Sequence, residues 1–280
     1  MKNRLLFFDI LRIFAVFSIV ASHAGFILLS ISIPGIYSAT LGGLGVTILL
    51  FVSGAVLMYN YQTKYSRFND VLEFYAKRLS RIYPAYWISL ILGLLMVPTL
   101  LYLPFSDIAL QFSGFMAFTN QWGGTINSIG WFIGLLVVLY LLFPVLEICF
   151  QKHPHISIFF LFVISNVSRL YFFNVGNRMS DWFPLCRLFE FGIGIYIIKI
   201  GFYPKWITQS DIIIFLSEIS FYLFLTHVLI FKLGSINLIF SLIALILLSI
   251  MLWITDEKIQ VFFSPFIKAI KNNNFAEIIH

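Results

Sequence analysis

Charged residues are scarce in this chain of 280 residues: 11% are Asp, Glu, Lys or Arg, whereas 60% are hydrophobic. Soluble domains carry about 25% charged residues, so this class of protein is excluded. Cysteine is scarce as well, and Cys149 and Cys186 lie in apolar stretches without a Cys-x-x-Cys spacing, which predicts structural thiols. The chain also lacks a linker, a low-complexity stretch and an internal repeat, so we expect one domain over residues 1–280.

Long apolar runs take the place of the missing charges. A helix needs about 20 mainly apolar residues to cross the roughly 30 Å of hydrocarbon in a bilayer. Eight windows of this kind occur, at approximately 5–30, 42–61, 83–104, 129–150, 156–173, 183–200, 211–231 and 236–254. Two of these windows are short, and a segment at 108–119 suits a re-entrant or interfacial helix. We therefore expect an all-α fold, a polytopic bundle of about 8 to 10 membrane-spanning helices.

The basic residues are distributed unevenly along the chain, which has a formal net charge of +6. If the N-terminus lies in the cytoplasm, most of the 18 Lys and Arg residues fall in cytoplasmic segments, as the positive-inside rule requires. The longest of these segments, residues 62–83, is followed by Pro84, which suits the first turn of the next span. The charge therefore predicts that both termini are cytoplasmic, and it does not indicate a nucleic-acid partner.

Arg12 and His23 lie inside the first apolar window, where an arginine costs about 2.5 to 3.5 kcal/mol. They are 11 residues apart, so on a helix they share one face and are separated by about 16 Å along the axis. Two interpretations remain open. Arg12 can form an interfacial pair with Asp9 while His23 caps the helix near external water. Alternatively, His23 is a general base, since an imidazole takes a proton from a hydroxyl near neutral pH, and Arg12 holds an anionic or carbonyl group.

Several segments, taken in order, resemble the motifs of the acyltransferase-3 family of membrane acyltransferases. Arg12 and His23 match the family's opening R-x10-H signature. Further matches follow at 45–54, which ends in Ser-Gly, at 78–86 (R-x-x-R-I-x-P-x-Y), at Trp131-Phe132 with 140–144, at 187–194 (R-x-x-E-F-x-x-G) and at 219–227. Each motif is weak alone, whereas their order over residues 7 to 230 is specific.

The chain departs from the family pattern in two respects. The fourth motif of the family often carries a glutamate after Trp-Ser, but here Trp131 is followed by Phe132, Ile133 and Gly134. The role of that carboxylate is therefore absent or taken by another residue, with Glu147 and Glu190 as candidates. The chain is also shorter than the usual ten-span core of the family, without the appended extracytoplasmic domain that some members carry.

The resemblance implies an O-acyltransferase that moves an acyl group, most often acetyl, from cytoplasmic acyl-CoA to a hydroxyl of a cell-surface or lipid-linked polysaccharide. Its setting would be a bacterial plasma or inner membrane, with acetyl-CoA as co-substrate and no permanently bound cofactor. His23 would activate the acceptor hydroxyl or carry the acyl group, and Arg12 would orient the donor. Lys77, Arg78 and Arg81 would bind the phosphates of coenzyme A, although anionic lipid headgroups and topology explain them equally simply.

Four further residues are candidates for supporting the substrates. Arg187 and Glu190 are three residues apart, which favours a mutual ion pair over a contact with donor or acceptor. Trp131 suits an interfacial anchor or a platform for a sugar, and His227 would lie on the external side, near the acceptor. Ser53 and Gly54 indicate close helix packing. We expect no metal site.

Two other classes of function remain as alternatives. In a transporter of a small molecule or a lipid-linked sugar, Arg12 and Glu190 would line the substrate path. Several transporter folds show paired halves and broken helices, which this sequence does not indicate. The third class is a non-catalytic membrane partner in a glycan-synthesis complex, with which the missing glutamate is compatible.

Overall fold

A computed structural model describes residues 4–25, 30–33, 37–62, 68–119, 126–176, 178–232 and 238–272. The chain divides into two compact units that alternate along the sequence. The first unit comprises Met1–Asn60 and Glu190–Trp253, and the second comprises Tyr61–Phe189 and Ile254–His280. We describe each unit by itself, and the single domain expected from the sequence stays a prediction.

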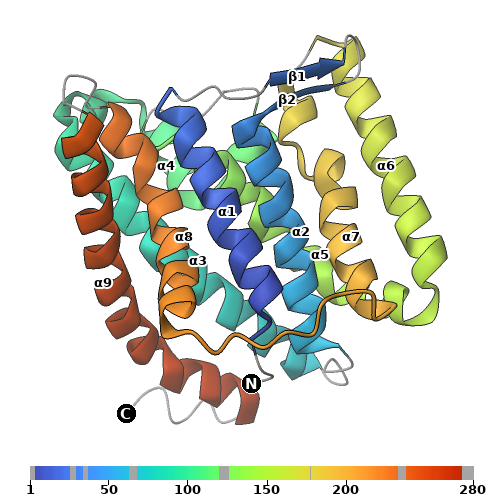
Figure 1. Ribbon diagram of the computed structural model, residues 1–280. Helices are drawn as coiled ribbons and strands as arrows, with labels where there is room; N and C mark the ends of the chain where they lie inside the picture. Colours follow the sequence, from blue (N-terminus) through green and yellow to red (C-terminus); the bar gives the residue numbers. More distant parts are fainter. Residues whose placement is uncertain are drawn as a thin grey trace. The chain divides into compact units, whose positions relative to one another are not determined.

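The first unit is helical apart from one short hairpin (Figure 1). It contains α1 (Leu6–His23), β1 (Ser30–Ile33), β2 (Tyr37–Thr40), most of α2 (Leu41–Tyr61) and of α7 (Leu188–Lys199), α8 (Asp211–Lys232) and the first part of α9 (Leu238–Asn272). Gly25 follows α1 with a φ of +86°, a conformation that favours glycine and ends the helix. The helical class predicted from the sequence is confirmed, and the exceptions in the described part of this unit are the antiparallel pair β1–β2 and a single β-bridge between Leu5 and Ile207.

Small residues let α2 approach its neighbours closely. A Cβ atom on Gly54 would overlap the carbonyl oxygen of Phe191 in α7, and one on Gly194 would overlap the carbonyl oxygen of Phe51 in α2. Membrane helices gain contact energy from such close backbone approach, because apolar burial alone does not distinguish protein from lipid. The packing role predicted for Gly54 is therefore confirmed.

The second unit consists of helices of very different length. Its α-helices are α3 (Phe68–Met96), α4 (Phe105–Ser113), α5 (Gly130–Lys152), α6 (Pro154–Asn174) and the end of α9, and its 3-10 helices are η1 (Pro98–Tyr102), η2 (Phe115–Phe118), η3 (Arg178–Asp181) and η4 (Pro184–Arg187). Three side chains of α3 fix the end of α4: the Tyr83 hydroxyl, the Tyr86 hydroxyl and the Trp87 indole N–H each donate to a carbonyl of residues 111–113 at 2.8 Å. The carbonyls of the last helical turn lack the N–H groups of a following turn, so the aromatic donors help to satisfy this helix end, together with the N–H of Gly114, which donates to the Gln111 carbonyl at 3.0 Å.

Helix α3 begins well before the span expected from the sequence. It runs from Phe68 through Pro84, which therefore lies inside the helix and not in its first turn. Proline lacks the N–H that would bond the carbonyl of Ser80, four residues earlier. The Nε2 amide of Gln260 in α9 donates to that carbonyl at 2.7 Å and replaces the missing hydrogen bond. The expectation of a helix start at Pro84 was wrong because a partner from another helix compensates for the proline.

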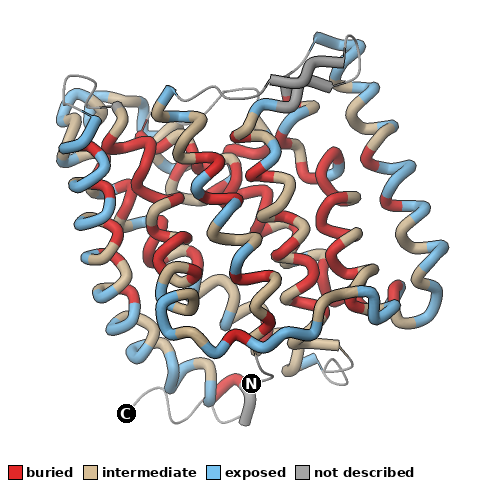
Figure 2. The backbone as a smooth tube through the Cα atoms, viewed as in Figure 1, coloured by how far each residue is buried: buried red, intermediate tan, exposed pale blue. Residues whose placement is uncertain are grey.

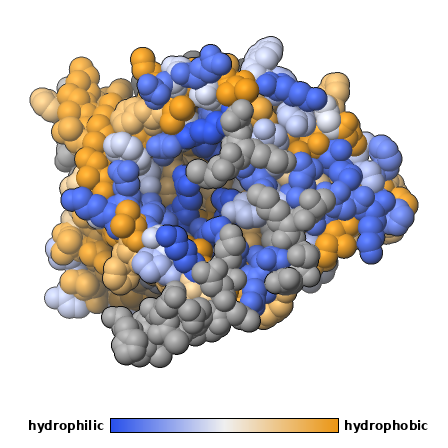
Figure 3. All heavy atoms as spheres, turned by 90° about the horizontal axis from the view of Figure 1, so that it is seen from below, coloured by the Kyte–Doolittle hydropathy of each residue, from blue (hydrophilic) through white to orange (hydrophobic). Residues whose placement is uncertain are grey.

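Seven helices in the described part of the chain are long and apolar enough to cross a membrane: α1, α2, α3, α5, α6, α8 and α9. The expected window at 183–200 instead forms η4 and the 12-residue α7, which is too short for an independent span. The predicted count of 8 to 10 is thus not reached in these helices. Most of α6 is exposed or partly exposed (Figure 2), and its buried residues are Leu161 and Ser165. Its exposed apolar residues include Phe159, Phe160 and Val167, as expected for a helix that faces lipid. Figure 3 shows hydrophilic side chains gathered on the face seen from below, with hydrophobic side chains at its edge.

Candidate active site

Helix α1 carries both polar residues that the sequence singled out, and each of them contacts α8. Arg12 contacts Ser217 of α8, and His23 contacts His227 of the same helix. Both pairs advance in the same direction along the chain, so α1 and α8 run parallel. The prediction that Arg12 and His23 share one face of a helix is confirmed, and this face packs against α8.

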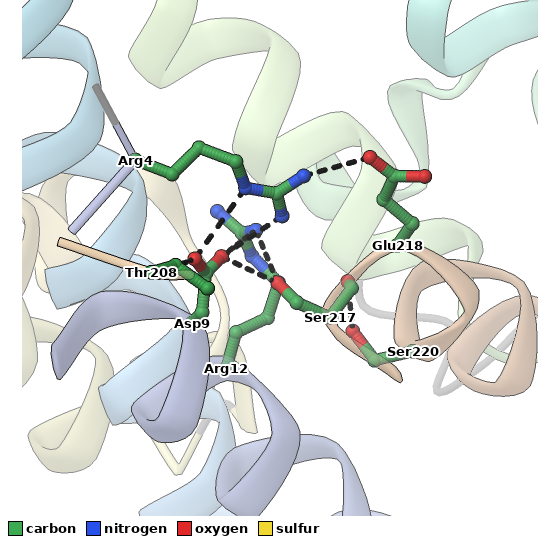
Figure 4. Close-up of polar contacts among 7 residues, drawn as sticks. All are labelled: Arg4, Asp9, Arg12, Thr208, Ser217, Glu218 and Ser220. Atoms are coloured by element: carbon green, nitrogen blue, oxygen red, sulfur yellow. Dashed lines mark hydrogen bonds and ion pairs between the residues drawn. The ribbon is translucent and has the colours of Figure 1, made fainter. Parts of the chain in front are cut away.

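At the beginning of this helix pair, a network that we call the arginine cluster surrounds Asp9 (Figure 4). Arg4 donates from its guanidinium to Asp9 at 2.9 Å and to Glu218 of α8 at 2.7 Å. The Asp9 carboxylate also accepts hydrogen bonds of 2.7 Å from the hydroxyls of Thr208 and Ser217. The cluster consists of Arg4, Asp9, Arg12, Thr208, Ser217 and Glu218.

Arg12 joins the cluster through two contacts. Its NH1 group donates to the Ser217 hydroxyl at 2.9 Å and lies 3.6 Å from the Asp9 carboxylate. The pair with Asp9 that the sequence suggested is therefore present, although Arg4 is the closer partner. The sequence did not predict the ion pair between Arg4 and Asp9. Arg4 lies five residues before Asp9, and this spacing does not by itself show that the arginine side chain reaches the carboxylate.

The charges of the arginine cluster balance. Two guanidinium groups, of Arg4 and Arg12, face two carboxylates, of Asp9 and Glu218. Burial acts to lower the pKa of Arg4, but its hydrogen bonds and charge interactions with Asp9 and Glu218 outweigh burial and raise this pKa, so the side chain stays cationic. A site for a phosphate needs an excess of positive charge. The balance of charges favours a structural clamp over a phosphate site.

A peptide segment completes this clamp. The backbone N–H of Leu6 donates to Trp206 at 2.8 Å, and the backbone N–H of Thr208 donates to Arg4 at 3.0 Å. These two bonds hold the chain before α8 against the start of α1, which brings the Thr208 hydroxyl to Asp9. Thr208 had no signal in the sequence, since 199 residues separate it from Asp9.

At the other end of the helix pair lie two imidazole rings. His23 is the last residue of α1 and is exposed, whereas His227 is fully buried. Their ring centroids are 4.8 Å apart, with an angle of 71° between the planes, an edge-to-face contact. Nδ1 of His23 lies 2.9 Å from the carbonyl oxygen of Ile19. A carbonyl only accepts, so Nδ1 carries the hydrogen in the neutral ring and Nε2 carries the lone pair.

The three basic residues predicted to bind coenzyme A all lie on α3, in the second unit. Lys77 is exposed and forms an ion pair with Glu73, one turn earlier. The guanidinium of Arg78 lies 4.8 Å from the centre of the Tyr61 ring, a cation–π contact. Arg81 is exposed. The three side chains therefore differ in their contacts: Lys77 is paired with a carboxylate, Arg78 contacts an aromatic ring, and Arg81 is exposed to the surroundings.

The remaining predicted residues are divided between the units. Trp131 is half-buried in the first turn of α5, with its ring edge-to-face with Phe132. Arg187 is buried, and its Nε donates to the backbone carbonyl of Asp181 at 2.6 Å. Glu190 is buried in α7 and belongs to the first unit, so the expected ion pair between Arg187 and Glu190 stays a prediction. Among the described residues, no group of three or more His, Cys, Asp or Glu side chains could hold a metal ion.

The apolar helices indicate a multi-pass membrane protein, and two histidine rings meet at the end of its first helix. The family model described as an acyltransferase domain, acyltransferase-3, matches residues 5–272, nearly the whole chain. The chain therefore belongs to the acyltransferase-3 family, and the resemblance drawn from the ordered motifs is confirmed. Comparison with curated proteins and with solved structures gives no match.

Proposed function

We propose that this membrane acyltransferase moves an acetyl group from cytoplasmic acetyl-CoA to a hydroxyl of a cell-surface or lipid-linked polysaccharide, in the plasma or inner membrane of a bacterium. The observation that carries the proposal is the state of His23. Its ring is exposed at the end of α1, its Nδ1 is held by the carbonyl of Ile19, and its Nε2 bears the lone pair. An imidazole held in this way is suited to accept a proton from a hydroxyl.

The reaction needs one base and no change of oxidation state. Nε2 of His23 takes the proton of the acceptor hydroxyl while the hydroxyl oxygen attacks the thioester carbonyl. The carbon–sulfur bond then breaks, and the thiolate of coenzyme A takes the proton from the imidazolium, which restores His23. A covalent variant, in which Nε2 attacks the thioester first, uses the same atom.

Arg12 acts in this proposal as an orienting residue. Its side chain is 28% exposed, and its NH1 group bonds Ser217 and approaches Asp9. These contacts hold the face of α1 that carries His23 against α8. Arg12 would thereby keep α1 in place against α8, and its exposed part would face the donor.

The donor would be bound on the cytoplasmic side by the basic residues of α3. The positive-inside rule supports this assignment, since it would put Lys77, Arg78 and Arg81 on the side where acyl-CoA is present. Arg81 is exposed and Lys77 is already paired with Glu73, so we expect Arg81 to contribute more to phosphate binding than Lys77. Trp131, Arg187 and Glu190 would support the substrates, and the buried His227 would do so through its contact with His23.

Transfer of labelled acetyl groups tests the proposal. Purified protein in lipid nanodiscs is incubated with radiolabelled acetyl-CoA and surface polysaccharide from the producing cells. We expect His23→Ala to lower the rate about 10²- to 10⁴-fold, the usual contribution of a general base. His153→Ala is the matched control, because His153 is an exposed histidine of the second unit. Undiminished transfer by folded His23→Ala would refute the assignment, and uptake of a labelled sugar into vesicles without acyl donor would favour a transporter.

A further inference from the structure

His227 has an environment unlike that of His23. Its side chain is fully buried on α8, with the rings of Phe224 and Phe231 at centroid distances of 5.7 and 6.4 Å. Its Nδ1 lies 2.7 Å from the carbonyl oxygen of Phe224. As in His23, this carbonyl requires a hydrogen on Nδ1, so the lone pair of the neutral ring is on Nε2.

Nε2 of His227 is a buried acceptor that no described residue bonds. Leaving such an atom without a donor costs about 1 to 3 kcal/mol, and native proteins rarely leave one. The neighbouring hydroxyl of Thr226, by contrast, bonds both the carbonyl of Tyr222 and the hydroxyl of Ser249 in α9. The open atom is therefore specific to the histidine and is not a property of the surrounding helix packing.

His227 contacts the ring of His23, which is the ring that would acquire a proton in the proposed reaction. Among the described residues, the titratable side chain that contacts His23 is His227. From α2, the neighbour on this side is Gly42, which lies against Ser22 and brings no charge. Phe224 and Phe231 on α8 and Ser249 on α9 are uncharged as well. Within the described part of the chain, His23 thus forms no ion pair with a carboxylate that would offset a positive charge, in contrast to Arg4 and Arg12 of the arginine cluster.

We propose that His227 is the positioning residue of His23, whose open Nε2 lone pair stabilises the imidazolium that forms on His23 during acyl transfer. This inference rests on the proposed function. The proton that His23 takes from the hydroxyl goes on to the thiolate of coenzyme A, so His227 gains and loses no atom and keeps its own hydrogen on Nδ1. The carbonyl of Ile19 holds Nδ1–H of His23, as a carboxylate does in many catalytic triads, and His227 adds an uncharged acceptor beside the ring.

Diethyl pyrocarbonate provides a test that requires no acyl donor, since it carbethoxylates neutral imidazole. The rate of modification of His23 is measured against pH by peptide mass spectrometry. Loss of the stabilising lone pair favours the neutral ring, so in His227→Phe the half-maximal rate should move to lower pH by about one unit. His227→Gln, whose amide oxygen can occupy the place of Nε2, should stay near wild type, whereas His227→Asn, which reaches only the place of Nδ1, should resemble His227→Phe.

Thr226→Val controls for packing, because Thr226 is equally buried one residue away and its substitution also removes a hydrogen bond. It should leave the pH profile of His23 unchanged even where it lowers the unfolding temperature. Identical profiles in wild type and all three His227 variants would overturn the proposal, as would a shift in Thr226→Val equal to that in His227→Phe.

Acetyl transfer then separates this inference from the proposed function. With the polysaccharide assay above, His227→Phe and His227→Asn should lower kcat about 10-fold or more with the KM for acetyl-CoA unchanged, and His227→Gln should restore most of it. If His23→Ala abolishes transfer while all His227 variants keep the wild-type kcat, the function stands and the positioning role fails. If His23→Ala transfers normally while the modification profile still shifts in His227→Phe, the ring contact stands and the proposed function fails.

Discussion

The two polar ends of the α1–α8 pair differ in how completely their groups are bonded. At the beginning of the pair, the Asp9 carboxylate accepts hydrogen bonds from Arg4, Thr208 and Ser217. The guanidinium of Arg4 also donates to the carboxylate of Glu218. At the other end, each histidine uses Nδ1 for a carbonyl of its own helix and keeps a lone pair on Nε2. A satisfied network contributes to structure, whereas an uncommitted lone pair is available for chemistry.

Removing the centre of the satisfied network should have the largest effect on stability. Asp9→Asn keeps the shape of the side chain but leaves Arg4 and Arg12 with a single carboxylate. Breaking a fully buried pair costs about 3 to 5 kcal/mol, and here, because both arginines are about one third exposed, we expect about 2 kcal/mol. The free energy of unfolding in mixed micelles measures this change.

The same variant also tests the comparison between the two ends. Asp9→Asn should leave the pH profile of diethyl pyrocarbonate modification at His23 unaltered, since the histidines lie at the opposite end of α1. A shift in that profile, with the fold intact, would mean that the cluster tunes the base and that the two ends are not independent.

The next largest effect should be on the affinity for the acyl donor, which we attribute to basic residues of α3 and to neither end of α1. Arg78→Ala combined with Arg81→Ala should weaken binding of acetyl-CoA about 10-fold, or about 1.4 kcal/mol, and more at low salt. The matched control is Lys258→Ala combined with Lys268→Ala, which removes two exposed charges from α9. Isothermal titration calorimetry in nanodiscs measures the affinity of wild type and of both double variants for acetyl-CoA. Unchanged affinity in the α3 variant would leave those arginines a topological role only. Tighter binding in Asp9→Asn, which gives the arginine cluster a net positive charge, would move donor binding to that cluster.

Helical periodicity placed Arg12 and His23 on one face, because the rotation per residue is the same in every α-helix. Periodicity does not show which helix this face packs against. Glu218 is 214 residues from Arg4, and only the folded chain brings them together. His227 was recognised as a candidate, but its contact with His23 had no signal in the spacing of either residue.

Both errors in the fold concern a segment that contains a proline. Pro84 resembled a helix start, since proline suits the first turn, and the rescue of the Ser80 carbonyl by Gln260 involves a residue 180 positions away. The window at 183–200 is apolar enough for a span, but it starts as a 3-10 helix that contains Pro184. Composition measures how apolar a segment is and not where its helix begins.

The smallest effect on stability should come from Glu218, the partly exposed carboxylate of the arginine cluster. Glu218→Gln removes a carboxylate whose side chain is 33% exposed, and the Arg4 side chain it meets is 34% exposed. Exposed ion pairs contribute about 0.2 to 1 kcal/mol, so the free energy of unfolding should fall by about 0.5 kcal/mol. Salt should reduce the difference from wild type, because screening weakens exposed pairs more than buried ones. A loss as large as that of Asp9→Asn would show that Glu218 is as essential to the clamp as the buried carboxylate, because Arg4 then could not be held by Asp9 alone.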